Sequence, residues 1–323
     1  MSSEFEIIQR YFKRPTNDTI LGIGDDAAII APTAKMELAI STDTLVSGQH
    51  FFEDVDPYKL GYKAISVNLS DMAAMGARPR WVTLSLTLPK KLIEYNEVWL
   101  SEFARGFHEL AQMHHVALIG GDTTSGPLNI GVQIIGEIES GQSLRRDGAK
   151  SGDDIWVSGY LGDAALALKF ELQKIKLTDK EAELCMSALH MPIARIELGQ
   201  LLTGLAHSAI DISDGLMADL GHILVSSRSA AIIQLEAVPC SEVLKRFLPS
   251  SLAVQCLLAG GDDYELCFTA PKKNRNSIES IAQKLKIPLT MIGEITQGEG
   301  LLVMDAEGRE ITVEKRGYDH FAS

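Results

Sequence analysis

Short apolar runs of strand length alternate with longer helical patterns along most of this chain, and that alternation limits the folds open to it. Apolar residues recur at helical spacing over Pro57–Met75 and about Ile93–His114. Strand-like runs surround these helices, among them Glu37–Ile40, Trp81–Leu88 and Ile130–Ile138. This order of patterns favours an α/β or α+β class.

The chain is long enough for more than one domain. At about 150 residues per domain, its 323 residues predict two. A polar, glycine-containing stretch over 139–152 is typical of a junction between domains. We therefore expect an N-terminal domain over residues 1–140 and a C-terminal α/β domain over residues 150–323.

The charge and cysteine content exclude several functional classes. The 43 acidic and 30 basic residues give a net charge of −13, which argues against nucleic acid or an anionic membrane as a partner. There is no run of about 18 apolar residues and no apolar core of a secretion signal, so we expect a cytoplasmic protein. The four cysteines lack Cys-x-x-Cys spacing, which indicates core residues and neither a zinc site nor disulfides.

Acidic residues recur after apolar strands and in glycine turns. The groups are Gly22–Ala28 with Asp25 and Asp26, Ser41–Thr44 with Asp43, Gly120–Thr124 with Asp122, Asp211–Gly215 with Asp214, and Gly260–Glu265 with Asp262. Ordinary explanations exist: the first group could be an Asx turn, and the second and fourth could cap helices. Carboxylate and hydroxyl oxygens beside glycine-rich backbone also suit magnesium ions and phosphate groups.

Asp71 differs from these acids because it falls inside a predicted helix, far from both ends. It lies one turn from Asn68 among alanines and methionines, where an ionised carboxylate is costly unless it is paired or bound to a cation. Exposure to solvent is the alternative. Together with Arg146 in the junction as a phosphate clamp, the acids predict a magnesium–nucleotide site.

The common motifs for related chemistry are missing. The sequence has no Gly-Lys dipeptide and hence no P-loop, and it lacks the protein-kinase signatures. His108-Glu109 begins like a metalloprotease motif, but Gln112 stands where the second histidine is needed. No Gly-x-Ser-x-Gly elbow indicates a serine hydrolase. A nucleotide site must therefore hold phosphate in another way.

The motifs, taken in order, resemble those of the thiamine-monophosphate kinase family. The resemblance covers nearly the whole chain and rests on Gly22-Ile23-Gly24-Asp25-Asp26, Ser41-Thr42-Asp43-Thr44, the stretch from Ser66 to Pro79 around Asp71, Gly120-Gly121-Asp122-Thr123-Thr124, Asp211-Ile212-Ser213-Asp214-Gly215-Leu216, Gly260-Gly261-Asp262-Asp263-Tyr264-Glu265-Leu266 and Gly317-Tyr318-Asp319-His320-Phe321. It implies the two-domain fold of the aminoimidazole ribonucleotide synthetase-like superfamily. It also implies a homodimer whose N-terminal sheets pair into a barrel.

The resemblance implies ATP-dependent phosphorylation of thiamine monophosphate to thiamine diphosphate, the last step of thiamine diphosphate biosynthesis. The implied ligands of several Mg²⁺ ions are Asp26, Ser41, Thr42, Asp43, Asp71, Asp122, Asp211 and Asp214. The implied ATP contacts are Gly121, Asp122, Arg146 and Ser213, and the implied contacts of thiamine monophosphate are His50, Asp262 and Tyr318. One departure is Asp262, where the family often has Glu.

The chemistry expected of such a site is direct in-line transfer, because an ionised phosphate oxygen needs no catalytic base. Two alternatives stay open. One is another ATP-dependent enzyme of the superfamily, although the first cysteine is Cys185 and the chain ends in Ser323, unlike its cysteine-dependent members. The other is a magnesium–nucleotide-binding relative without catalytic activity.

Overall fold

The computed structural model describes residues 4–16 and 19–321, and the chain divides into two compact units. Unit 1 contains the described residues up to Met72 together with Ala77–Gly141, and unit 2 contains Ala73–Gly76 and the chain from Gln142 onward. The division after Gly141 falls inside the stretch 139–152. The four residues Ala73–Gly76 group with unit 2 although the chain on either side of them belongs to unit 1.

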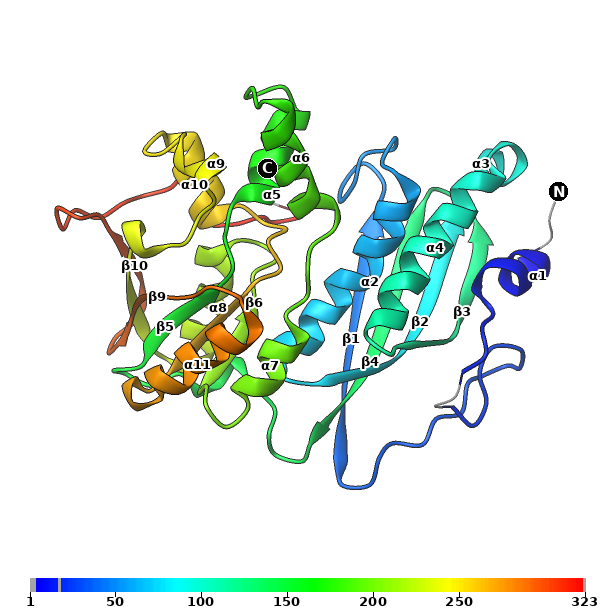
Figure 1. Ribbon diagram of the computed structural model, residues 1–323, viewed down its shortest axis with the longest axis horizontal. Coiled ribbons are helices and arrows are strands. Elements are labelled where there is room, and N and C mark those ends of the chain that lie inside the picture. The colour runs from blue at the N-terminus through cyan, green and yellow to red at the C-terminus, as the bar shows by residue number, and fades with distance from the viewer. Residues whose placement is uncertain (1–3, 17–18, 322–323) are drawn as a thin grey trace. The chain divides into compact units, whose positions relative to one another are not determined.

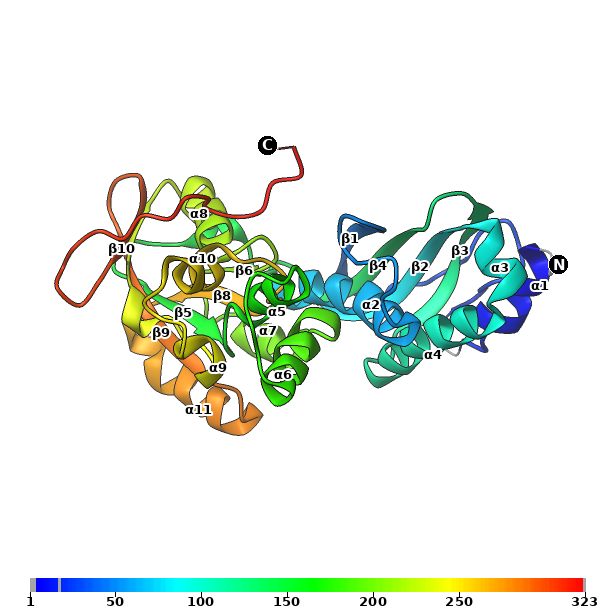
Figure 2. The ribbon, with the colours of Figure 1, turned by 90° about the horizontal axis from the view of Figure 1, so that it is seen from above.

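Unit 1 contains a four-stranded sheet in the order β1-β4-β2-β3. The strands are β1 (Met36–Val46), β2 (Arg78–Leu88), β3 (Ala117–Ser125) and β4 (Asn129–Glu139), and the helices are α1 (Glu4–Ile7), a π-helical turn (Ile8–Phe12), α2 (Pro57–Ala74), α3 (Lys90–Tyr95) and α4 (Glu97–Met113). β4 pairs antiparallel with β1 and β2, and β2 pairs parallel with β3. Both α2 and α4 lie on the same face of this sheet (Figures 1 and 2).

Two glycines allow α2 and α4 to touch main chain to main chain. A Cβ built on Gly61 of α2 would lie 2.0 Å from the carbonyl oxygen of Phe103, and one on Gly106 of α4 would lie 2.0 Å from the carbonyl oxygen of Tyr58. Neither position has room for a side chain. The separation of the two helices is therefore fixed by backbone contact.

β1 and β3 extend well beyond the apolar runs that predict them. β1 continues from Glu37–Ile40 to Val46, because residues Met36–Val46 stay in register with β4. The prediction that Ser41–Thr44 could cap a helix is wrong. Gly120–Thr124 likewise lies within β3 instead of following it, since these residues pair with β2.

The helix predicted over about Ile93–His114 is two helices. Asn96 leaves the helical region at φ −141° and ψ 66°, and its side chain accepts the N–H of Trp99 at 3.0 Å. It therefore caps α4 after α3 has ended. Asparagine is favoured at such caps, and its short side chain competes with helix continuation.

Unit 2 contains a six-stranded sheet in the order β10-β7-β9-β5-β8-β6. The strands are β5 (Asp154–Ser158), β6 (Ser208–Asp211), β7 (Ala230–Gln234), β8 (Leu266–Ala270), β9 (Leu289–Thr296) and β10 (Gly300–Met304). The helices are α5 (Asp163–Glu171), α6 (Asp179–His190), α7 (Ile196–Leu202), α8 (Leu216–Ser227), α9 (Glu242–Lys245), α10 (Ser251–Ala259) and α11 (Arg275–Leu285). β10 and β7 are parallel, and the other neighbours are antiparallel.

Helices cover both faces of the unit 2 sheet, with α8 and α11 on opposite sides (Figure 2). One face presents Ile155 and Val157 to the main core, where Ile223 of α8 also lies. On the other face Trp156 stacks on Phe268 of the adjacent strand, with ring centres 6.4 Å apart. Both faces of the strands are therefore apolar, as expected for a sheet between two helical layers.

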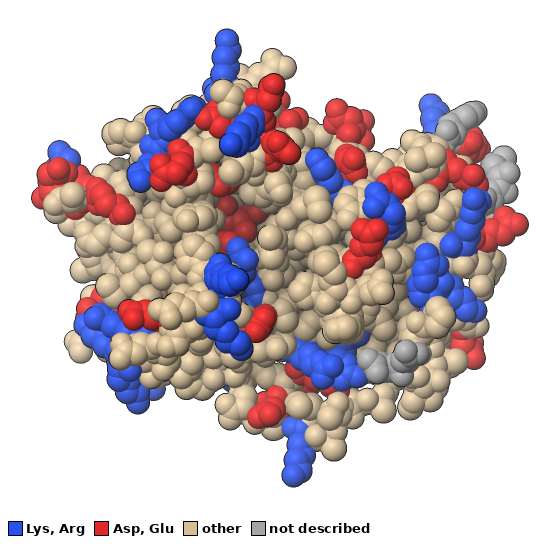
Figure 3. Space-filling model, viewed as in Figure 1, with Lys and Arg blue, Asp and Glu red and all other residues tan. Residues whose placement is uncertain are grey.

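Three of the four cysteines are buried, as predicted, and Cys240 is half-buried. In the part of the chain that the structure describes, no helix combines the length and apolar character needed to cross a membrane. Acidic and basic side chains are interspersed on the face shown in Figure 3.

Replacing Gly106 by alanine tests the backbone contact. Overpacking costs about 1–3 kcal/mol and outweighs the gain in helix propensity of up to about 1 kcal/mol, so we expect a lower free energy of unfolding in urea. Gly221→Ala in α8 is the matched control, because a Cβ there meets nothing within 4 Å. It should raise stability by about 0.5–1 kcal/mol. Equal effects of the two substitutions would contradict the contact.

Candidate functional site

Two predicted ligands, Ser41 and Asp71, meet between β1 and α2 in unit 1, and a third, Asp43, lies on the same face of β1 as Ser41. The Ser41 hydroxyl donates to Oδ2 of Asp71 at 2.5 Å, so Ser41 points to the face of the sheet that α2 covers. Asp43 lies two residues further along β1, and side chains two apart share a face. Asp71 is half-buried and hydrogen-bonded, so it is not a solvated surface acid.

Thr42 and Asp122 are separated from this group. Thr42 is exposed on the opposite face of β1, and its hydroxyl accepts a hydrogen bond from Gln133 Nε2 at 3.3 Å. Asp122 lies in β3 at the other edge of the sheet, three strand spacings or about 14 Å from β1. Asp122 pairs with Ser85 of β2, whereas Asp43 pairs with Val132 of β4, which in turn pairs with Leu84 of β2. Leu84 and Ser85 are consecutive and point to opposite faces of the sheet, so Asp122 points to the face opposite Asp43. A single unit 1 therefore does not bring Asp122 or the Thr42 hydroxyl to Asp43.

The glycine next to Asp122 has a structural reason. A Cβ on Gly121 would lie 1.9 Å from the carbonyl oxygen of Leu84, and its φ of +148° is one that other residues rarely adopt. The close approach of β2 thus explains this glycine without any ligand. Gly121 itself is exposed on β3.

The remaining predicted residues of unit 1 lie on turns. Asp26 is exposed after Gly24, whose φ is +134°, and the N–H of Asp26 bonds to Oδ1 of Asp25 at 3.0 Å. This bond joins adjacent residues, whereas the Asx turn given above as the ordinary explanation joins an acid to the N–H two residues further on, so it is not that turn. His50 Nδ1 accepts the N–H of Val46 at 3.0 Å, so a neutral ring carries its proton on Nε2.

In unit 2, the predicted loop Asp211–Gly215 joins β6 to α8. Asp211 is buried at the end of β6, while Ser213 and Asp214 are half-buried. No side chain caps α8, so the prediction that Ser213 or Asp214 is a helix cap is wrong for the described structure. The N–H groups of Ser213, Asp214 and Gly215 all bond to Oδ2 of Asp219 instead, at 3.0, 3.0 and 3.1 Å.

Two other predicted segments attach to the carbonyls of this loop. The N–H of Asp262 donates to Ser213 at 2.9 Å, and the N–H of Tyr318 donates to Asp214 at 3.0 Å. Asp262 and Tyr264 have φ of +70° and +50°, a region that non-glycine residues rarely enter. Three segments far apart in sequence are thus brought together around Ser213 and Asp214.

Carboxylates crowd this part of unit 2. Burial, together with the charges of Asp211 and Asp214, raises the pKa of the Asp219 carboxyl to about 7. Burial also raises the pKa of Asp214, to which Asp262 adds while His320 opposes the rise. A divalent cation near these acids would relieve both effects.

The donor sets of both units fit magnesium, which binds hard oxygen ligands and often uses only one or two carboxylates besides water and phosphate. Unit 1 offers the oxygens of Ser41, Asp43 and Asp71, and unit 2 offers those of Asp211 and Asp214. Among the described residues, no three His, Cys, Asp or Glu side chains form a closed metal cluster. The sets suit ions whose coordination is completed by other oxygens.

Arg146 occupies a short 3₁₀ turn at the start of unit 2. Its side chain is exposed, and its carbonyl accepts the hydroxyl of Ser227 in α8 at 2.8 Å. The neighbouring Arg145 pairs with Asp147 at 2.7 Å. The predicted phosphate clamp is therefore anchored by its backbone to the helix that follows the Ser213–Asp214 loop.

Sequence reasoning missed the residues that hold the Asp262 loop. Glu265 is buried and forms a bidentate pair with Arg195, and it also accepts the hydroxyl of Ser158 at 2.5 Å. Arg195 lies 70 residues from Glu265, and no local pattern links them. The role of Asp219 was also missed. Its position four residues after Gly215 was a local pattern that could have indicated an acceptor for the N–H groups of this loop.

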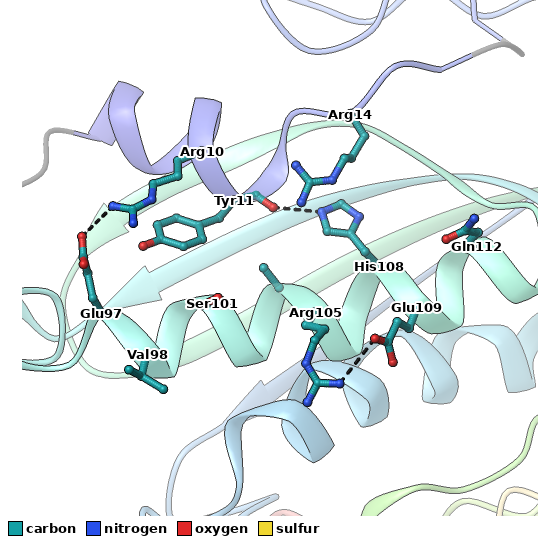
Figure 4. A pocket seen from close by; sticks show the side chains of 11 residues that line it. Arg10, Tyr11, Arg14, Glu97, Val98, Ser101, Arg105, His108, Glu109 and Gln112 are labelled. Carbon is teal, nitrogen blue, oxygen red and sulfur yellow. Dashed lines mark hydrogen bonds and ion pairs between the residues drawn. The ribbon is translucent and has the colours of Figure 1, made fainter.

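A cavity of about 540 Å³ lies between the π-helical turn and α4 (Figure 4). Arg14 and His108 line it, and Nε2 of His108 lies 3.0 Å from the carbonyl oxygen of Tyr11. None of the predicted site residues lines this cavity.

Comparison with known proteins places both units in one family. The AIR synthase related protein N-terminal domain matches residues 24–138, and the corresponding C-terminal domain matches residues 150–305. The thiamine-monophosphate kinase of Escherichia coli (strain K12) is 45% identical over 99% of this chain and 98% of its own.

Two solved structures extend the comparison. The thiamine-monophosphate kinase of Stenotrophomonas maltophilia K279a is 45% identical with a TM-score of 0.84, covering 95% of this chain and 96% of its own. The protein described as AaThiL, complexed with AMPPCP and TMP, is 32% identical with a TM-score of 0.78, covering 93% and 92%.

The pair of Arg195 and Glu265 gives a stability test. Arg195→Met leaves the Glu265 carboxylate buried without its partner, and we expect a loss of about 3–5 kcal/mol in the free energy of unfolding. Arg10→Met is the matched control, because Arg10 and Glu97 form an exposed pair at 2.6 Å that should contribute at most about 1 kcal/mol. Similar losses in both variants, measured by urea denaturation, would refute a special role for the buried pair.

Proposed function

This chain belongs to the thiamine-monophosphate kinases within the AIR synthase related family, and on that basis we propose that it transfers the γ-phosphate of ATP to thiamine monophosphate. The observation that carries the proposal is 45% identity over 99% of the chain to a thiamine-monophosphate kinase. A structural relative complexed with AMPPCP and TMP adds support. The product is thiamine diphosphate.

The reaction brings two polyanions together, so charge neutralisation is the main requirement. Bound Mg²⁺ ions supply this by neutralising and aligning the phosphates of ATP and the acceptor. The acceptor is a phosphate oxygen that is ionised near neutral pH, so the chain need not provide a catalytic base. We propose direct in-line transfer without a phosphoenzyme.

Ser41, Asp43 and Asp71 are our proposed magnesium ligands in unit 1. Their support is the contact between Ser41 and Asp71 and the shared face of Asp43. We also propose Asp26 and Asp122 as magnesium ligands. Gly121 and Asp122 are the proposed contacts of ATP in this unit. For Thr42 only the main chain is retained, because its hydroxyl already accepts a hydrogen bond from Gln133 on the face opposite Asp43.

Asp211 and Asp214 are the proposed ligands in unit 2, with Ser213 and Arg146 on ATP. Asp214 is half-buried beside Asp262 and Asp319, and a cation there would offset both its burial and these neighbouring charges.

His50, Asp262 and Tyr318 are the proposed contacts of thiamine monophosphate. His50 can donate from Nε2, because its Nδ1 is occupied by the N–H of Val46. Asp262 and Tyr318 are both hydrogen-bonded to the loop that carries Ser213 and Asp214. Their backbone attachment would keep the acceptor near the nucleotide.

We further propose a homodimer in which the uncovered faces of the unit 1 sheets pair into a barrel. Both α2 and α4 cover the other face (Figures 1 and 2). Leu38 and Ile40 alternate with the α2-facing Ser41 and are 40% and 59% exposed. Because these two residues lie two positions apart on one strand, their side chains are neighbours on that face and form an apolar surface that pairing of the sheets would bury.

The direct test is to incubate the protein with Mg²⁺, ATP and thiamine monophosphate and to separate the thiamine species. We expect thiamine diphosphate, and none when chelator replaces Mg²⁺. Asp43→Asn should nearly abolish turnover with the fold retained, because it removes a ligand charge with little change in volume.

Glu139→Gln is the control for Asp43→Asn. It removes one negative charge from an exposed acid at the end of β4, outside the proposed site, and should keep most of the turnover. No product from folded wild-type protein would refute the function. Wild-type turnover in Asp43→Asn would exclude Asp43 as an essential ligand.

Ile40→Lys tests the dimer. A charge buried at a sheet interface is costly, so we expect this variant to sediment as a monomer while the wild type sediments as a dimer. Val225→Lys is the control, because Val225 is an apolar residue of unit 2 that is 80% exposed. A monomeric wild type, or a dimeric Ile40→Lys variant, would count against the proposed interface.

A further inference from the structure

One buried carboxylate holds the loop that carries Ser213 and Asp214. Oδ2 of Asp219 accepts the N–H groups of Ser213, Asp214 and Gly215. Asp219 is only 3% exposed, and its own N–H donates to the carbonyl of Gly215 at 3.0 Å. Its side chain and main chain thus both bind the loop just before α8.

Three consecutive N–H groups around one anion form a backbone nest. In many proteins such a nest before a helix binds the phosphate of a ligand. Here the protein's own carboxylate already occupies it. These three N–H groups are therefore not available to a nucleotide.

The carbonyls of the same peptide groups are also in use. Ser213 accepts the N–H of Asp262, and Asp214 accepts the N–H of Tyr318. Rotating the peptide planes around Ser213 and Asp214 would break these bonds together with those to Asp219. The orientation of all three segments therefore depends on the acceptor at the centre of the nest.

We propose that Asp219 is a positioning residue that sets the orientation of Ser213 and Asp214 toward the magnesium–nucleotide. This inference rests on the proposed function. Asp219 acts through the backbone of the loop and touches neither substrate nor metal. An amide at this position keeps one acceptor oxygen without the charge, and an alanine removes the acceptor, so the two changes should have graded effects.

The test compares Asp219→Asn and Asp219→Ala with a matched control, Asp305→Asn. Asp305 is also a buried acid, 7% exposed, and its Oδ1 accepts the N–H groups of Glu307 and Arg309 at 3.0 and 2.8 Å. It lies in a turn outside the proposed site. The probe is Mg²⁺ with AMPPCP, whose binding is measured by calorimetry, and thermal unfolding and kcat are measured on the same samples.

We expect Asp219→Asn to weaken AMPPCP binding about tenfold, as for the loss of charge from hydrogen bonds to an ionised group, and Asp219→Ala to weaken it further. Asp305→Asn should lower the unfolding temperature and leave binding unchanged. Wild-type affinity in Asp219→Asn would overturn the proposal. So would losses of affinity that follow stability in all three variants.

If Asp219→Ala does not fold, the AMPPCP affinity of Asp219→Asn alone tests the proposal. A wild type that binds AMPPCP but forms no thiamine diphosphate would refute the proposed function alone. The comparison of binding among the variants would still test Asp219.

Discussion

Repulsion between closely placed carboxylates is the constraint on which the rest of this site depends. Metal-binding acids must lie near one another, yet each additional charge in a half-buried setting raises the cost of the others. Hydrogen-bond donors from the protein's own backbone and side chains offset this cost. Asp71 receives the Ser41 hydroxyl, Asp219 receives three N–H groups, and Glu265 receives the guanidinium of Arg195. Asp219 and Glu265 are buried with these donors, whereas Asp214 and Asp262 are only half-buried.

The buried acids hold the segments of the site in place, whereas the half-buried residues on those segments are the ones that we propose to bind ligands. Asp219 and Glu265 are buried, and both accept hydrogen bonds from within unit 2. Ser213, Asp214 and Asp262 are half-buried, and the bonds of their main chain fix the segments on which they lie. A rigid backbone under partly open side chains is the arrangement that preorganised binding of a charged substrate requires.

Local patterns predicted the parts of the site that local sequence controls. The loop Asp211–Gly215 lies between a strand and a helix, as its apolar flanks indicate, and the helix around Asp71 is where its spacing places it. The side of β1 to which Thr42 points could not be predicted, because it depends on pairing of the strand with β4, about 90 residues later. The edge position of Asp122 and the pair of Arg195 with Glu265 depend in the same way on topology, which no short motif encodes.

The glycine contact between α2 and α4 reaches further than the stability of two helices. Asp71 lies ten residues beyond Gly61 on α2, which is about 15 Å along the helix axis. Any side chain at Gly61 or Gly106 would push α2 away from α4, and the Asp71 carboxylate would move with it relative to Ser41 on β1. The spacing of the two main chains therefore also sets where Asp71 lies, although neither glycine is near that carboxylate.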